Sequence, residues 1–510
     1  MDYLLGIDLG STSLKGIIYD LDGNLIAGGS RKTELYHPDK EHPDWAVWQP
    51  EQIWEGTAAA IRDAVAAIDD PKSIKACAVT GMGMDGVPID AEGNSLYPFI
   101  SWHDPRTAPQ YEWWLENVTV AKTFSIGGNP VWPINSVLRI RWMMEHEPEI
   151  LGRTDKWLLI EDFLNFKLSG RRVTDYSMAS TTALFDQRSL GWSDELIELS
   201  GVDRRLLCEV QPSSTPIGEV TADAAKMTGL PEGTPVVLGG HDHLCGALPV
   251  GVFRPGTVLN ITGTWECVMT PTARPELQPE FPTMGLTVQA HVARGMHTIW
   301  GGNVSADMVE WYRDQFGFEA KHKAGQGGGS DWDHLIEAAA ASPPGANRVM
   351  FLPHISGASC PVVDNNSKGA FVGLTKTATG GDMLRAIFEG LDYQFLDVVQ
   401  AVETNLGTQL ERFIVVGGAV RNEFWMQNKA DMVGRPVEVP AVEEASPLGC
   451  AMLAGIGAGL YKDTEDAYQH VSKPGKTYEP DPKLTEKYRA GFEIYKQLYP
   501  ALKTVHHAMS

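Results

Sequence analysis

The first residues of the chain form a pattern that could bind a phosphate group. Residues 3–9 (YLLGIDL) and 14–21 (LKGIIYDL) have the apolar character of buried strands, and a short polar turn joins them. The turn and the start of the second strand supply small groups, hydroxyls and one cation: Gly10, Ser11, Thr12, Ser13 and Lys15. Backbone amides, hydroxyl groups and a lysine can converge on one anion. The alternative is a polar surface turn without a ligand.

Asp8 lies at the end of the first strand, beside this candidate phosphate site. A carboxylate next to a phosphate is unfavourable unless a cation lies between the two. The pattern therefore predicts a Mg²⁺ ion that Asp8 binds directly or through water. An aspartate in this place can also simply cap or shape the turn.

A second polar turn, GGHDHLCG at 239–246, follows an apolar strand expected from residue 235 onward. Two glycines before Asp242 would let a ligand approach the backbone closely. An aspartate so placed could accept a proton from a substrate hydroxyl, and His241 or His243 could be the base instead. The alternative is a structural aspartate that caps the next helix. A serine-based hydrolase is not indicated, because the chain contains no GxSxG motif.

Two further turns could hold the rest of a nucleotide. NITGTWE at 260–266 places Gly263 and Thr264 between two apolar segments, as a second phosphate cradle or a plain β-turn. VVGGAVRN at 415–422 places Gly417 and Gly418 after a strand, where a flat ligand face could lie on bare backbone and Asn422 could supply an amide. Its spacing does not fit the GxGxxG fingerprint of dinucleotide-binding proteins.

The elements expected around these turns alternate strand and helix, which predicts an α/β fold. Helices are expected at 49–68, 135–150, 156–170, 381–403 and 446–460, the last with Ser446 as its N-cap and Pro447 in its first position. Residues 321–331 are expected to form a loop tip. A domain boundary near residue 250 separates two halves, and each half contains one strand–turn–strand hairpin, which hints at a duplicated domain.

Length and composition limit the class of protein. A chain of 510 residues is too long for one ordinary core, so two domains are expected. A net charge of −23 argues against nucleic acid and anionic membranes as partners. The six cysteines are scattered and form no CxxC pair, and we find neither a signal peptide nor a membrane-spanning apolar run. These features predict a reduced, cytoplasmic protein.

Taken in order, the motifs resemble the FGGY family of carbohydrate kinases. The resemblance runs from about residue 3 to about residue 460. Its motifs are GIDLGSTSLK, SWHDPR, TDYSMASTTALFD, GGHD, TGTWE, GAFVGLT, GGAVRNEFWMQNKADMVGRPVEVP and PLGCAMLAG. It implies two ribonuclease-H-like domains around a cleft, a fold shared with actin, hexokinase and the heat-shock chaperone ATPases. Residues 1–250 would bind the sugar and carry the first phosphate loop, and residues 251–510 would bind ATP.

The resemblance also implies roles for individual residues. Asp8 matches the family's metal-associated aspartate and Asp242 its catalytic base, which would also contact the substrate. The hairpin turns, with Gly417, Gly418 and Asn422, match the ATP site. The positions that hold the substrate in the family correspond here to Asp85, Trp102, Asp104, Arg106 and His243. The implied cofactors are ATP and Mg²⁺, and a homodimer is expected.

Within the family, residues 81–108 and 263–269 are most similar to L-fuculokinases. Glycerol kinases carry an Arg-Glu pair, and xylulokinases a Met-His pair, in the loop where this chain has GMGMDG. Glycerol is therefore disfavoured as the substrate and xylulose is in doubt. We expect an uncharged ketose or polyol, phosphorylated on a terminal hydroxyl. A non-enzymatic, nucleotide-switched protein and a sugar-phosphate isomerase or dehydrogenase are the alternatives.

Overall fold

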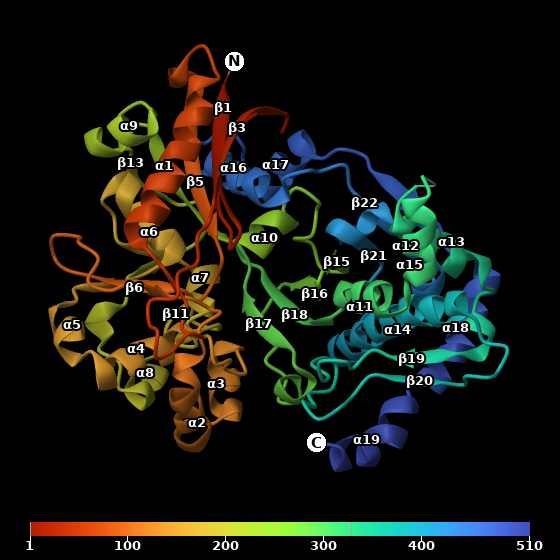
Figure 1. Cartoon of the computed structure of the whole chain (residues 1–510). Coiled ribbons are helices and arrows are strands. Elements are labelled where there is room, and N and C mark those ends of the chain that lie inside the picture. Colours follow the sequence, from red (N-terminus) through yellow and green to blue (C-terminus); the bar gives the residue numbers. More distant parts are fainter. Residues whose placement is uncertain (1, 328) are drawn as a thin grey trace.

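Two mixed β-sheets, one in each half of the chain, form the frame of the molecule (Figure 1). The computed structural model describes residues 2–327 and 329–510. The first sheet has the strand order β13-β14-β5-β1-β2-β3. Its strands are β1 (Tyr3–Leu9), β2 (Ser13–Asp20), β3 (Leu25–Lys32), β5 (Ile74–Gly81), β13 (Pro216–Glu219) and β14 (Pro235–His241).

The second sheet has the order β17-β18-β16-β15-β21-β22-β23 and repeats the plan of the first. Its strands are β15 (Thr257–Thr262), β16 (Trp265–Thr272), β17 (Thr287–Ala290), β18 (His297–Val304), β21 (Arg412–Val416), β22 (Val437–Val439) and β23 (Lys476–Tyr478). Each sheet is built around one hairpin, β1–β2 or β15–β16. The second strand of the hairpin pairs with an antiparallel neighbour, β3 or β18. On the other side, the first strand is followed by two parallel strands, β5 and β14 in the first sheet and β21 and β22 in the second. The shared topology agrees with the duplication that the two hairpins suggest.

Helices cover both sheets, and they include all five regions where the apolar periodicity predicts a helix. The predicted helices at 49–68 and 381–403 are α1 (Pro50–Ala66) and α14 (Gly380–Leu406). The other helices are α2 (Ala108–Asn117), α3 (Val120–Gly127), α7 (Tyr176–Ser180), α8 (Asp194–Ser200), α9 (Ala222–Thr228), α10 (Asp242–Ala247), α11 (Ala306–Phe316), α13 (Asp331–Ala341), α15 (Glu423–Val433), α17 (Thr464–Val471), α18 (Pro482–Tyr495) and α19 (Leu498–Ala508), besides those described next. Short paired strands complete the lobes: β4 (Val47–Trp48) with β7 (Phe99–Ile100), β9 (Val173–Asp175) with β12 (Glu209–Gln211), β10 (Phe185–Asp186) with β11 (Gly191–Trp192), and β19 (Met350–Leu352) with β20 (Ala370–Val372).

Two predicted helices differ from expectation. The helix expected at 135–150 is divided into α4 (Ser136–His146) and α5 (Pro148–Arg153), because Pro148 cannot continue the hydrogen-bond ladder of α4. The helix expected at 156–170 begins only at residue 160, as α6 (Ile160–Ser169). Residues 156–159 instead form β8 (Lys156–Leu159), which pairs with β6 (Gly86–Ile89).

Two more boundaries differ from the sequence analysis. The loop tip expected at 321–331 is partly helical, because α12 (Phe318–Gly325) extends into it, and Gly328 lies outside the described residues. The helix expected from Ser446 is α16 (Ala445–Gly457), and its N-cap is Glu444. Ser446 and Pro447 therefore lie inside the first turn.

Helix α16 comes from the second half of the chain but packs on the first sheet. The fit is close: a Cβ on Gly6 of β1 would lie 1.9 Å from the carbonyl oxygen of Pro447, and a Cβ on Gly449 would lie 1.8 Å from that of Cys245. One buried apolar cluster accordingly joins residues of β1, β5, β14, β15, α10 and α16. The strands of the first sheet end at residue 241 and those of the second begin at residue 257, whereas α16 crosses from the second half of the chain to the first sheet.

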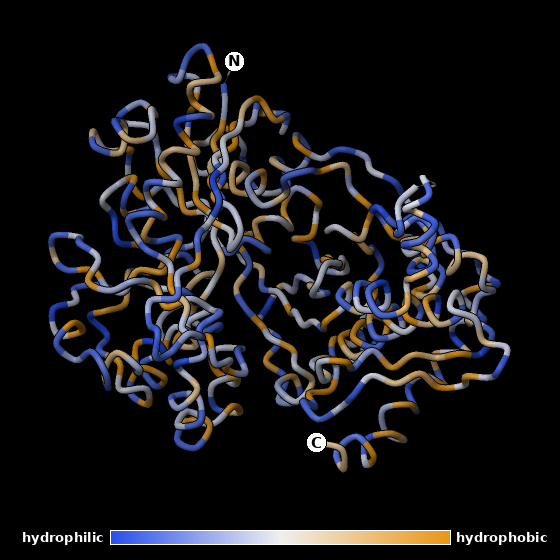
Figure 2. The backbone as a smooth tube through the Cα atoms, viewed as in Figure 1, coloured by the Kyte–Doolittle hydropathy of each residue, from blue (hydrophilic) through white to orange (hydrophobic). Residues whose placement is uncertain are grey.

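Hydrophobic stretches lie mostly inside each lobe, and many of the outer loops are hydrophilic (Figure 2). All six cysteines are unpaired and buried, as expected for structural thiols. None of the helices in the described ranges, 2–327 and 329–510, is long and apolar enough to cross a lipid bilayer.

Candidate active site

Two of the predicted turns and the loop GMGMDG meet at one edge of the first sheet. Strands β1, β5 and β14 run parallel, and Leu9 and His241 both pair with Gly81 at the carboxyl end of β5. Asp8 therefore lies at the same edge as the loop after Gly81 and as Asp242, which follows β14. In open α/β sheets the carboxyl ends of parallel strands are where ligands bind.

Asp8 and Asp242 are close enough to influence each other electrostatically. The pKa of Asp8 is raised to about 7, first because the carboxyl is buried and second because Asp242 carries a like charge nearby; Lys15 opposes this rise. Two carboxylates that repel each other, one of them poorly hydrated, are a favourable place for a cation. The other half of a Mg²⁺ coordination sphere would come from water and phosphate oxygens, which this ion prefers to an all-protein site. No cluster of three or more metal-ligating side chains occurs among the residues that the structure describes.

Asp242 is the first residue of α10 and is partly exposed, at 23% for its side chain. One carboxylate oxygen accepts the backbone N–H of His243 at 2.6 Å, and imidazole nitrogens of His241 and His243 lie 3.7 and 3.8 Å from that oxygen. Burial lowers the pKa of His241 to about 4, so this imidazole is neutral near pH 7. His243 is half exposed. Of the three candidate bases, His241 is the least suited, because its side chain is buried.

Lys15 forms an ion pair that sequence reasoning missed. Its ammonium donates to both carboxylate oxygens of Glu444, at 2.7 and 2.9 Å. Glu444 is 429 positions away and is brought to the hairpin by α16, which it caps. In strand register Lys15 lies opposite Asp8. The predicted phosphate-binding cation is therefore shared with a carboxylate in this structure and must exchange partners to bind a phosphate.

The two turns predicted for the nucleotide lie together at one edge of the second sheet. Ile261 of β15 pairs with Val416 of β21, so the turn containing Gly263 and Thr264 and the one beginning at Gly417 start side by side. Gly417 has φ 105°, and a Cβ there would lie 2.5 Å from a carbonyl oxygen of β15. A Cβ on Gly418 would meet no protein atom within 4 Å, so this backbone is open to a ligand.

Two features behind these turns hold them in place. The side-chain oxygen of Asn422 accepts the backbone N–H of Trp425 at 3.1 Å, which makes Asn422 the N-cap of α15 and leaves its NH₂ group for other partners. Beneath the hairpin, the buried Lys429 bridges Glu266 and Asp392 at 2.7 and 3.3 Å. No sequence pattern indicated this buried ionic group.

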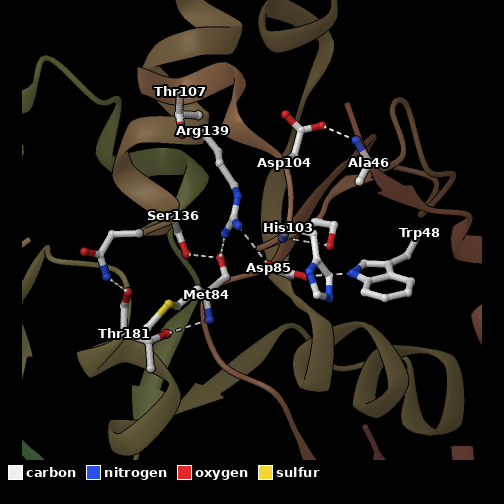
Figure 3. Close-up of polar contacts among 12 residues, drawn as sticks. Ala46, Trp48, Met84, Asp85, His103, Asp104, Thr107, Ser136, Arg139 and Thr181 are labelled. Carbon is white, nitrogen blue, oxygen red and sulfur yellow. Dashed lines mark hydrogen bonds and ion pairs between the residues drawn. The ribbon is translucent and has the colours of Figure 1, made fainter. Parts of the chain in front are cut away.

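Of the residues expected to bind the sugar, Trp102 is exposed and Asp85 is buried. Trp102 is 38% exposed, and its ring stacks on His103 with the ring centroids 3.7 Å apart. Asp85 accepts the indole N–H of Trp48 at 2.7 Å and pairs with Arg139 at 3.0 Å (Figure 3). Burial raises the pKa of Asp85 to about 6, although Arg139 and the Trp48 indole oppose the rise. Asp85 therefore fixes an aromatic side chain in this structure instead of facing solvent.

Asp104 and Arg106 require a correction. The sequence analysis expected both to contact sugar hydroxyls, but their side chains are 0% and 1% exposed and pair with each other at 2.6 Å. Asp104 also accepts the backbone N–H of Ala46, and the Arg106 guanidinium lies 3.9 Å above the Trp45 ring. Asp104 is the N-cap of a short helical turn and Arg106 lies two residues later in that turn, so their side chains can pair locally. This pairing leaves neither group facing a ligand.

Comparisons with known proteins match this geometry to one family. The model of the FGGY family of carbohydrate kinases, N-terminal domain, matches residues 3–249, and that of the C-terminal domain matches residues 258–458. The chain is 28% identical over 470 residues to L-fuculokinase of Escherichia coli (strain K12), covering 92% of this chain and 95% of that protein. It is 28% identical over 524 residues to xylulose kinase of Lactococcus lactis subsp. lactis (strain IL1403), covering 100% and 99%.

Among solved structures, xylulose kinase from Rhodospirillum rubrum superimposes with a TM-score of 0.88 at 28% identity, covering 99% of this chain and 100% of that one. The fold is thus the predicted one, with two domains of the actin and hexokinase type. A non-enzymatic switch, an isomerase and a dehydrogenase do not fit, because both matched models describe kinases. The chain belongs to the FGGY family of carbohydrate kinases and is an ATP-dependent sugar kinase.

Proposed function

We propose that this kinase phosphorylates a free ketose or polyol on a terminal hydroxyl, with Asp242 as the general base. The observation that carries the proposal is the place of Asp242. It is a partly exposed carboxylate at the carboxyl end of β14, next to the phosphate-type hairpin that contains Asp8 and Lys15. A base at this point can reach a substrate hydroxyl while the hairpin binds the phosphates.

The proposed reaction assigns one task to each group. ATP supplies the phosphoryl group, and Mg²⁺ held near Asp8 would neutralise charge on it. Asp242 orients the attacking hydroxyl and accepts its proton as the bond to phosphorus forms. Lys15 leaves Glu444 to pair with a phosphate oxygen. Backbone groups of the hairpin turns at residues 10–13 and 263–264 contact the phosphates.

The remaining residues would bind the adenine ring of ATP and the sugar. Gly417 forms the tight turn, Gly418 offers open backbone to the adenine ring, and the free NH₂ of Asn422 lies at the end of the same turn. On the sugar side, the exposed Trp102 ring can cover an apolar C–H face, and His243 can contact a hydroxyl. The buried arginines of this region, Arg106 and Arg139, are paired with carboxylates, which favours an uncharged sugar over a sugar phosphate.

An ATP-coupled screen tests the proposal. The panel contains ketopentoses, 6-deoxyketohexoses, tetritols, pentitols, glycerol and sugar phosphates, with L-fuculose first. A free ketose or polyol should give the highest kcat/KM, and mass spectrometry with NMR should locate the new phosphate on a terminal carbon. Glycerol or a sugar phosphate as the best substrate would contradict the proposed pocket. We also propose a homodimer, which sedimentation equilibrium measures directly.

A further inference from the structure

The loop that follows β5 contains a strained turn next to the proposed sugar site. The backbone N–H of Asp85 donates to the carbonyl of Gly83 at 3.0 Å, which closes a three-residue γ-turn around Met84. Met84 has φ 79°, a conformation that residues with a side chain rarely adopt. The γ-turn with positive φ is the rare and strained form. Such strain persists only where the surroundings impose it.

Three buried side chains from two helical segments hold the turn at Met84 in its strained form (Figure 3). The carbonyl of Met84 accepts the Ser136 hydroxyl at 2.5 Å and the Arg139 guanidinium at 2.7 Å. The N–H of Met84 donates to the Thr181 hydroxyl at 3.0 Å. Ser136 and Arg139 belong to α4, and Thr181 is the C-cap of α7. All three are at most 2% exposed, so both backbone groups of Met84 are paired inside the protein.

The turn also touches both sides of the proposed sugar site. A Cβ on Gly83 would lie 2.8 Å from the imidazole of His241, the residue before Asp242. On the other side Asp85 holds the Trp48 indole, whose ring lies edge-on to His103, the residue after Trp102. A shift of the turn would therefore displace both His241, next to the proposed base Asp242, and His103, next to the exposed Trp102 ring.

We propose that Thr181, Ser136 and Arg139 are positioning residues that hold the Gly83–Met84–Asp85 turn in its strained form, and that this form sets the affinity of the kinase for its sugar. The inference rests on the proposed function for the identity of the site. These three residues need no contact with the sugar. They act through the turn, and the nucleotide turns of the second sheet do not depend on them.

Arg139 is a poor first target, because its loss would leave Asp85 buried without a counter-ion. Thr181→Val is nearly isosteric and removes the hydroxyl, which accepts the Met84 N–H and donates to the carbonyl of Met178 within α7. We expect it to raise KM for the sugar about tenfold, since a buried N–H then lacks its partner. KM for ATP and the affinity for ADP should stay unchanged. Thr181→Ser, which keeps the hydroxyl, should restore most of the sugar affinity, and Ser136→Ala should act like Thr181→Val.

Thr182→Val is the matched control, because Thr182 is an equally buried neighbour whose hydroxyl bonds to Ala179 and Leu184 instead of the turn. It should leave KM for the sugar unchanged. Equal effects of Thr181→Val and Thr182→Val, a parallel loss for sugar and ATP, or an unchanged sugar KM in Thr181→Val would each overturn the positioning role. A wild-type chain that phosphorylates no sugar in the panel would instead contradict the proposed function.

A second pair of variants tests the strained turn without any activity. Met84→Gly and Met84→Ala remove the same contacts of the side chain, but only glycine adopts positive φ freely. We therefore expect a higher Tm for Met84→Gly than for Met84→Ala, the reverse of the usual order. A higher Tm for Met84→Ala would show that Met84 is not held in a strained conformation and would refute the proposal.

Discussion

Replacing Asp8 by asparagine should make the unliganded protein more stable while it abolishes most of the kinase activity. Asparagine has nearly the same shape, so the variant keeps the packing of β1 and removes the negative charge. In the wild type this charge is held near Asp242 in a poorly hydrated place, which is unfavourable until a cation arrives. The loss of activity follows from the proposed role of Asp8 beside Mg²⁺.

The size of the gain follows from the pKa of Asp8, which is raised from 3.8 to about 7. Because the folded state holds this proton more tightly than the unfolded state does, the contribution of Asp8 to the stability of the wild type is most favourable below about pH 4, falls as the pH rises, and levels off above about pH 7. Above about pH 7, where the carboxyl is ionised in both states, this difference in pKa corresponds to about 4 kcal/mol of lost stability. Since the accessible surface of Asp8 shows that the residue is half-buried and not fully enclosed, water screens part of this effect, and we expect about half of it, ~2 kcal/mol, at pH 8.

Thermal unfolding of the wild type and Asp8→Asn at pH 5 and pH 8, without nucleotide, measures the effect. A gain of ~2 kcal/mol in a domain of this size raises Tm by about 4–8 °C. The gain in stability of Asp8→Asn over the wild type should be about twice as large at pH 8 as at pH 5, or more. Asp44→Asn, at an exposed aspartate, is the control and should leave Tm unchanged. Mg²⁺ with ADP should stabilise the wild type more than Asp8→Asn. An equal Tm difference at the two pH values, or a less stable variant at pH 8, would refute the reasoning.

Three further predictions concern the other site residues. Asp242→Asn should lower kcat by roughly 10²–10⁴-fold with unchanged ADP affinity, and a near-normal kcat in the coupled assay would exclude Asp242 as the base. Lys15→Ala should weaken ATP more than AMP in calorimetry, whereas Gly418→Val should weaken both; equal losses for ATP and AMP in Lys15→Ala would contradict the phosphate role. Asp85→Ala should lower the free energy of unfolding by about 3–5 kcal/mol, because it leaves the Arg139 guanidinium buried without a partner; a wild-type Tm would show that the pair contributes nothing.

The strand-end residues could be predicted from the sequence because the signal is local. Apolar runs of strand length end directly before Asp8 and Gly417, three residues separate the end of a third such run from Asp242, and parallel strands bring their carboxyl ends to one edge. The same local evidence failed at residues 156–159, where the apolar run KWLL fits a helix and a strand equally well. Pairing with β6, more than sixty positions earlier, decided in favour of the strand.

Partners far apart in the chain could not be predicted. Glu444 meets Lys15 only because α16 returns to the first sheet, and the pattern of either segment alone contains no sign of the other. Asp104 and Arg106 show a second limit. A carboxylate and a guanidinium two residues apart are equally suited to contact a ligand or each other, and burial, which decides between the two, is a property of the whole fold.

The return of α16 to the first sheet also determines when this protein can finish folding during its synthesis. Residues 1–250 leave the ribosome with all strands of the first sheet, but the face of β1 and β5 that meets Pro447 and Cys450 is still bare. At about 5–20 residues per second, translation needs roughly 10–40 s more to supply residues 445–457. During this interval the nascent chain exposes an apolar sheet face. The first sheet therefore completes its native packing only late in translation, and a chain that stops before α16 keeps this apolar face exposed.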